Sequence, residues 1–68
     1  MSAKFTVVIQ REDNWYVAIC LENNVASQGE TIDEAMQNLK EALVLYYEED
    51  RSLPKYSPIF VTTMEVSL

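Results

Sequence analysis

The sequence predicts an α+β fold, a two-layer sandwich with the order β-β-β-α-β in which one helix packs on one face of a small sheet. Three observations support this fold class. Two neighbouring runs alternate apolar and polar residues as strands do, a capped stretch repeats apolar residues at helical spacing, and a last alternating run follows the two prolines. The 68 residues are 49% hydrophobic, which fits one domain spanning residues 1–68.

The first three predicted elements are strands. Residues 5–10 alternate with one strongly apolar face, and residues 15–21 alternate with aromatic and β-branched side chains, so the polar residues between them form the turn of a hairpin. A second polar break, 22–24, precedes a short strand over 25–28 that ends at Gly29. We expect this glycine to supply a positive φ where the strand gives way to the helix.

The helix has the clearest boundary in the sequence. Thr31 and Glu34 fit a capping box, in which the Thr31 hydroxyl accepts from the Glu34 amide and the Glu34 side chain reaches back. The helix is expected to run to Glu49, and residues 59–66 are expected to form the last strand. Apolar residues at spacings of three and four define the expected buried stripe: Ile32, Ala35, Met36, Leu39, Ala42, Leu43 and Tyr46.

Self-association is the expected reinforcement of so small a core. A chain of this length buries only about 60% of its unfolded surface, and one cysteine and no histidine leave no disulfide and few metal ligands. The sheet face away from the helix is expected to stay apolar, and a homodimer or higher oligomer would shield it or pair a sheet edge. The residues predicted for this contact are Val8, Tyr16, Ala18, Cys20 and Tyr47.

The composition argues against several classes of function. Eleven acidic residues against five basic ones give a net charge of −6, which disfavours direct nucleic-acid binding and favours a basic protein partner, although it also serves solubility. Without histidine there is no Ser-His or Cys-His dyad, and one glycine cannot build a phosphate-binding loop. We therefore expect no enzyme activity, no catalytic residues, no metal and no cofactor.

The beginning of the chain lacks the features of a targeting signal. The apolar run over residues 5–9 is too short for a signal-peptide core or a membrane span. We expect a cytoplasmic protein without membrane contact. A lone cysteine agrees with a reducing compartment, and Cys20, placed within a strand, is expected to be a small buried hydrophobe rather than a nucleophile.

The most specific motif of the chain joins the third strand to the helix. It consists of Ser27-Gln28-Gly29-Glu30-Thr31 followed by Glu34-Ala35, Asn38-Leu39, Ala42 and Tyr46. Together with the hairpin FTVVIQREDNWYVAICLE and the ending MEVSL, it resembles the HicB-family antitoxins of prokaryotic toxin-antitoxin systems over essentially the whole chain. The resemblance implies a degenerate ribonuclease H-like or double-stranded-RNA-binding-like β-β-β-α-β domain without catalytic carboxylates.

The resemblance also implies a function. HicB-like domains bind and neutralise a small basic HicA-type toxin, an mRNA-cleaving ribonuclease, and cover its catalytic histidine; an acidic chain suits such a partner. The alternative is a stand-alone homo-oligomeric HicB-like module, structural or small-ligand-binding, with no toxin partner. The residues predicted to contact the toxin lie in the hairpin turn and the following loop: Glu12, Asp13, Asn14, Glu22, Asn23 and Asn24.

Two departures limit what the resemblance implies. HicB-family members commonly carry a C-terminal helix-turn-helix or ribbon-helix-helix segment that binds operator DNA, whereas this sequence ends with the predicted last strand, so no autorepressor activity is expected. Many members also have a Pro-Glu-Leu-Pro-Gly stretch between strands two and three. The shorter Leu21-Glu22-Asn23-Asn24 stands there in this chain, so any toxin contact of that loop must differ.

Overall fold

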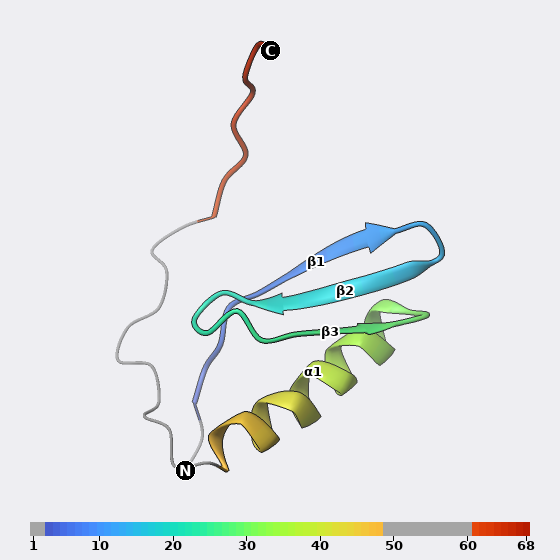
Figure 1. Cartoon of the computed structure of the whole chain (residues 1–68), viewed down its shortest axis with the longest axis vertical. Coiled ribbons are helices and arrows are strands. Elements are labelled where there is room, and N and C mark those ends of the chain that lie inside the picture. Colours follow the sequence, from blue (N-terminus) through green and yellow to red (C-terminus); the bar gives the residue numbers. More distant parts are fainter. Residues whose placement is uncertain (1–2, 49–60) are drawn as a thin grey trace.

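The computed structural model describes residues 3–48 and 61–68. It contains a three-stranded antiparallel sheet and one helix, in the order β1 (Val7–Glu12), β2 (Trp15–Cys20), β3 (Ala26–Gly29) and α1 (Ile32–Tyr47). The strands lie in sequence order across the sheet, and α1 runs across one face of it (Figure 1). The predicted α+β class and its β-β-β-α layout are therefore confirmed.

The central strand, β2, supplies half of the fully buried core. Side chains alternate along a strand, so every second residue of β2 faces α1 and the others face the opposite side of the sheet. Apolar side chains from β1 and from neighbouring segments surround the buried positions. The buried core residues are Ala18, Cys20, Ala35 and Leu39, and those packed against them are Phe5, Val7, Ile9, Tyr16, Val25 and Leu43.

Three residues predicted to lie on the open sheet face lie on the face covered by α1. Ala18 and Cys20 have no exposed surface, and Tyr16 packs half-buried against the same core. Their predicted place on the open face is wrong, because strand periodicity groups side chains correctly but does not tell which group the helix covers. Ala18 and Cys20 therefore offer no surface to a second copy. The face away from α1 carries Val8, as predicted, with Trp15, Val17 and Ile19.

The helix begins at the predicted capping box. Thr31 has an extended backbone, with φ −133° and ψ 163°, and its Oγ1 accepts a 3.0 Å hydrogen bond from the Glu34 amide. The Glu34 carboxylate reaches back one residue further than expected and accepts a 3.1 Å hydrogen bond from the Glu30 amide. Asp33 and Glu34 also place negative charge at the positive end of the helix dipole.

The helix buries a narrower stripe than its apolar spacing predicts. Ala35 and Leu39 are buried, whereas Ile32 and Met36 are 49% and 42% exposed. The reason is that α1 packs against β3 and β2, so only the side of the helix that faces these two strands is covered. The predicted helix end, Glu49, lies outside the described residues.

Gly29 joins the sheet to the helix through close packing rather than through an unusual backbone angle. Its φ is not positive, so the role expected from the sequence is wrong. A Cβ added there would lie 2.6 Å from the amide nitrogen of Ala35 and 2.9 Å from the carbonyl carbon of Glu34. Only a residue without a side chain lets α1 approach β3 this closely. Asn38 reinforces the contact, its Nδ2 donating a 2.8 Å hydrogen bond to the Gln28 carbonyl.

The segment predicted as the last strand is not paired in the structure. Residues 61–68 belong to no strand or helix, and all of them are exposed. Figure 1 shows this segment as an extended trace that runs away from the sheet. Residues 59 and 60, where the predicted strand begins, lie outside the described residues. A strand needs a neighbour to satisfy its backbone groups, and the described part of one chain gives this segment none.

Candidate protein-binding surface

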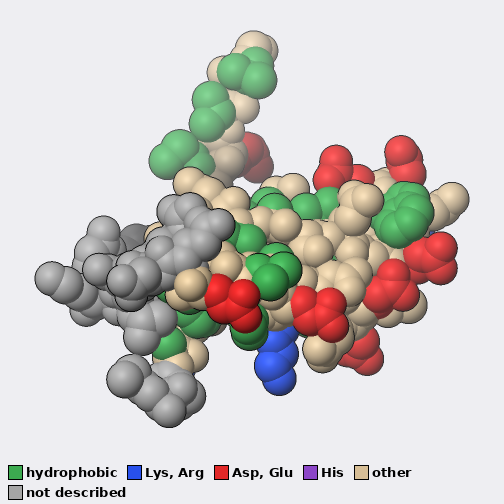
Figure 2. Space-filling model, turned by 60° about the horizontal axis from the view of Figure 1, so that its bottom comes forward, with side chains coloured by type: hydrophobic (Ala, Val, Ile, Leu, Met, Phe, Trp, Pro, Cys, Tyr) green, Lys and Arg blue, Asp and Glu red, His purple; other side chains and the backbone are tan. Residues whose placement is uncertain are grey.

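The β1–β2 turn and the connection from β3 to α1 lie at the same end of the sheet, and both carry acidic side chains. Glu12 pairs with Trp15 across the β1–β2 turn, and the next residue of β2, Tyr16, pairs with Gly29 at the end of β3. The register therefore places this turn beside the start of α1. We call the carboxylates at this end the acidic end: Glu12, Asp13, Glu30, Asp33 and Glu34, all exposed. Figure 2 shows acidic side chains gathered at the right-hand end of the molecule.

The β1–β2 turn is tight. Its two residues, Asp13 and Asn14, are exposed, and Asp13 has a φ of 55°, in the left-handed region that Asp tolerates better than most residues. Arg11 holds the turn from one side: its Nε donates a 3.3 Å hydrogen bond to the Asp13 carbonyl, and its guanidinium lies 6.0 Å from the ring centroid of Tyr16. The Arg11 cation thus braces the turn rather than pairing with a carboxylate of the acidic end.

An exposed aromatic side chain accompanies the acidic end. Trp15 is 43% exposed and pairs directly with Glu12, so the indole and the carboxylate project from the same face of the sheet. Tryptophan is enriched among the residues that dominate binding energy in protein interfaces. The Glu12 carboxylate beside it attracts a basic surface and disfavours an acidic one. An exposed indole beside a carboxylate suits a partner protein whose contact surface is apolar at its centre and basic around it.

The other predicted contact loop lies at the opposite end of β2, where Glu22 serves the fold. Glu22 Oε1 accepts a 2.8 Å hydrogen bond from the Thr6 amide and a 3.5 Å one from Cys20 Sγ. Its Oε2 is buried, and no described residue hydrogen-bonds to it. Burial acts to raise the pKa of Glu22. The hydrogen bonds that Glu22 accepts, including those from Thr6 and Cys20, together lower the pKa by more than burial raises it, so the pKa lies below its ordinary value. Glu22 is therefore a partly buried structural anion.

Asn23 and Asn24 shape the same loop. Asn23 Nδ2 donates a 2.9 Å hydrogen bond to the Tyr47 hydroxyl, and Asn23 Oδ1 accepts a 3.0 Å one from the Val25 amide. Asn24 is exposed and has a φ of 62°. Tyr47, predicted as an oligomer contact, is half-buried, and its ring centroid lies 5.7 Å from that of Phe5. The length of β2 separates this loop from the acidic end, so the predicted contacts do not form one surface.

The described residues offer little for metal or thiol chemistry. Within residues 3–48 and 61–68, no group of three or more His, Cys, Asp or Glu side chains is arranged to hold a metal ion. Cys20 is buried, and its burial raises the pKa of the thiol, which keeps the sulfur protonated. In the part of the chain that the structure describes, the helix lacks the length and apolar character needed to cross a bilayer.

Residues 3–57 match a protein family described as a family of unknown function, DUF7387. The chain belongs to this family. Among curated proteins, the UPF0150 protein ssr1765 of Synechocystis sp. is 40% identical over 57 residues, which cover 75% of this chain and 72% of that relative. No solved structure matches the chain significantly. The residues of the acidic end and of the Glu22 loop lie within the matched range.

In this DUF7387 member, the acidic end is assembled from residues far apart in the sequence. The sequence predicted Glu12 and Asp13 as contacts but not Glu30 and Asp33, which precede or begin the helix. The signal that finds them is the strand register. The two-residue turn after Glu12 pairs Glu12 with Trp15, and the loop between β2 and β3 pairs the next residue, Tyr16, with Gly29. Together the two pairings bring the helix start beside the turn.

Proposed function

We propose that this protein is an antitoxin-like binding protein that acts in the cytoplasm and neutralises a small basic, HicA-type mRNA-cleaving toxin by covering its active site. The acidic end is the observation that carries the proposal. Its five exposed carboxylates offer a basic ribonuclease a substitute for the phosphates of RNA. The resemblance of the Ser27–Thr31 motif and of the following helix to HicB antitoxins supports the same function.

The proposed mechanism is steric and electrostatic and needs no chemistry from this chain. Attraction between the acidic end and a basic surface raises the association rate and orients the partner before contact. Trp15, already 43% exposed beside Glu12, then packs against the apolar centre of the contact surface. The bound chain excludes RNA from the toxin because the two compete for the same basic surface.

The first test identifies the partner and its activity. The tagged chain captures proteins from a lysate of its own cells at low salt, and the captured basic protein is purified and assayed for mRNA cleavage with and without the chain. We expect cleavage that the added chain suppresses, and binding that weakens as the salt concentration rises. Recovery of homo-oligomer without an RNA-cleaving partner would contradict the proposal and favour a stand-alone oligomeric module.

Charge reversal separates the acidic end from the net charge of the chain. The double variant Glu12→Lys with Asp13→Lys is expected to slow association with the toxin by about 10-fold or more at low salt and to flatten its salt dependence. The control, Glu41→Lys with Glu48→Lys, makes the same charge change at exposed positions outside the acidic end. Equal slowing by both pairs would show that net charge alone drives binding.

Trp15 is expected to act on dissociation rather than association. Trp15→Ala removes the exposed indole and should raise the dissociation rate of the toxin complex with little change in the association rate. Trp15→Phe keeps an aromatic ring and should lose less affinity than the alanine variant. Surface plasmon resonance on the two variants separates the two rates. A complex with an unchanged lifetime in Trp15→Ala would place the contact elsewhere.

A further inference from the structure

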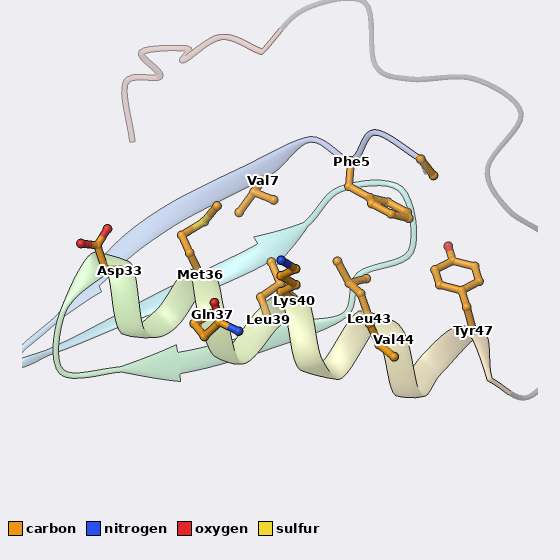
Figure 3. Close-up of a pocket in the computed structure, with 11 residues that line it drawn as sticks. Phe5, Val7, Asp33, Met36, Gln37, Leu39, Lys40, Leu43, Val44 and Tyr47 are labelled. Atoms are coloured by element: carbon orange, nitrogen blue, oxygen red, sulfur yellow. The ribbon is translucent and has the colours of Figure 1, made fainter. Parts of the chain in front are cut away.

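A groove runs between α1 and the outer strand of the sheet. Because α1 packs against β3 and β2, it covers the same face of β1 only in part, and Val7 and Ile9 on that face are half-buried. The resulting cavity has a volume of about 730 Å³ and mainly apolar walls (Figure 3). Its apolar lining includes Phe5 and Val7 on the β1 side and Met36, Leu43, Val44 and Tyr47 on the α1 side.

Part of the helix side of this groove is open to solvent. Met36 is 42% exposed and Val44 is 56% exposed. Figure 3 shows Phe5 and Val7 pointing from the strand side towards the helix, and Met36 pointing from the helix towards the strand. Exposed apolar surface of this kind is costly for a domain with so few buried residues, so an additional element packed into the groove would stabilise it.

The strand above the groove also has a free edge. The sheet order is β1-β2-β3, so among the described strands β1 has a neighbour on one side only. The pairing from Val7 to Glu12 is continuous, without a bulge or a proline that would blunt the outer edge. Unpaired backbone N–H and C=O groups along such an edge accept a further strand. A strand added there would place every second side chain over the groove.

The chain carries a segment that fits both the edge and the groove. Residues 61–68, VTTMEVSL, are rich in Val and Thr, which favour strands, and all of them are exposed. Met64 is 85% exposed and Val66 is 60% exposed. If the segment is extended, one face carries Thr62, Met64, Val66 and Leu68, and the other carries Val61, Thr63, Glu65 and Ser67. The first face is apolar enough to fill the groove, and the second is mostly polar.

We propose that two copies of this chain exchange residues 61–68, each copy adding this segment as a strand to the β1 edge of the other, with Met64 and Val66 in the groove. Each copy then donates one segment and accepts one, which gives a closed two-fold dimer. Within one subunit the segment is exposed and the groove is open. A second copy covers both, because its groove receives the segment of the first copy and its segment fills the groove of the first copy.

The mass of the full chain in solution, followed by analytical ultracentrifugation over a dilution series, tests the exchange. We expect a dimer, and Met64→Glu should raise its dissociation constant by about 10-fold or more because it drives a charge into the apolar groove. Thr63→Glu makes an equal change in charge one residue away on the other face and should keep the dimer. A monomeric parent chain, or equal effects of the two variants, would overturn the proposal.

A mixing experiment tests the reciprocal geometry. Val44→Glu should block the groove, whereas Leu45→Glu, at a neighbouring exposed position outside the groove, should not. Chains with Met64→Glu keep an intact groove, and chains with Val44→Glu keep an intact segment. At a concentration below the dissociation constants of the two variants, each variant alone should be mainly monomeric, and their mixture should form a heterodimer through one intact exchange. Unchanged circular dichroism shows that each variant folds. A mixture that stays monomeric, with both variants folded, overturns the exchange.

Discussion

Asn24 holds a backbone conformation that few side chains tolerate. Its φ of 62° lies in the left-handed region, and its amide donates a 2.8 Å hydrogen bond to the Cys20 carbonyl that closes the loop after β2. We expect Asn24→Ala to lower the free energy of unfolding by about 1 kcal/mol, whereas Asn24→Gly should be close to neutral. Urea unfolding measures both. Asn14→Ala is the control, because Asn14 is exposed without a positive φ; a loss as large as that of Asn24→Ala would contradict the explanation.

Glu22 links the stability of the fold to pH. Burial acts to raise its pKa, but several hydrogen bonds, first among them those from Thr6, together outweigh burial and hold the folded-state pKa below the ordinary value of 4.5. A lowered folded-state pKa contributes stability that is complete above the unfolded value and is lost as the pH falls through the folded one. We expect Glu22→Gln to cost about 1 kcal/mol at neutral pH. The variant should also lose less stability than the parent on acidification below pH 4.5.

Urea unfolding of the parent and of Glu22→Gln at a series of pH values measures this effect. The two stability curves should converge at acid pH, where the carboxylate of the parent becomes protonated and its advantage disappears. Curves that stay parallel over the whole range would contradict a role for the Glu22 charge. Parallel curves would mean that the hydrogen bonds and packing of the Glu22 side chain, and not its charge, account for its contribution to stability.

At the scale of elements, the β3–α1 contact depends on the absent side chain of Gly29. A Cβ there would lie 2.6 Å from the Ala35 amide nitrogen, so the helix or the strand must shift to accept Gly29→Ala. We expect this substitution to lower the free energy of unfolding by about 1–3 kcal/mol, the range for overpacked contacts. Thermal and urea unfolding measure the loss. Gln28→Ala, at the preceding exposed position, should change stability by less than about 0.5 kcal/mol, and a larger loss there would weaken the explanation.

The elements that could be predicted are those that local sequence determines. The hairpin follows from two alternating runs around a polar turn, and the helix start follows from the hydrogen bond between Thr31 and Glu34, which the structure contains. The width of the buried stripe could not be predicted in the same way. Met36 has the right spacing for the core, yet it faces the groove, because α1 packs against β2 and β3 more than against β1.

The two faces of the sheet illustrate a second limit. Alternation places Ala18 and Cys20 on one face and Val17 and Ile19 on the other, and both pairs are apolar. No local signal states which face meets the helix, because this depends on the connection from β3 into α1. The small side chains of Ala18 and Ala35, both fully buried, are the available indication, since small residues on both elements allow close packing.

At the scale of the whole molecule, the candidate site was the part least accessible to sequence reasoning. The acidic end combines a hairpin turn with a helix start, and the pairing of Tyr16 with Gly29 is what brings them together. The predicted loop at Glu22 is rich in polar residues, as binding loops are, but the side chains of Glu22 and Asn23 are hydrogen-bonded to the fold. Polar composition identified both loops, and only tertiary structure separates the exposed carboxylates from the structural one.

The carboxylates of the acidic end are expected to lower stability while they serve binding. Eleven acidic residues against five basic ones repel one another in the folded chain, and the strand register brings Glu12, at the end of β1, to the same end of the sheet as Glu30. Neither carboxylate caps the helix, which Thr31 and Glu34 do. The double variant Glu12→Gln with Glu30→Gln should therefore raise the thermal midpoint at low salt, and added NaCl should stabilise the parent more than the variant.

The same double variant should bind a basic toxin more weakly, which distinguishes charge kept for a partner from charge kept for folding. Differential scanning fluorimetry across a salt series measures the midpoint, and association kinetics measure binding. If the variant melted at a lower temperature than the parent at low salt, these carboxylates would be part of the folding energetics. In that case the removal of these carboxylates could not be used to test binding. The charge-reversal variant Glu12→Lys with Asp13→Lys would then need its own measurement of stability.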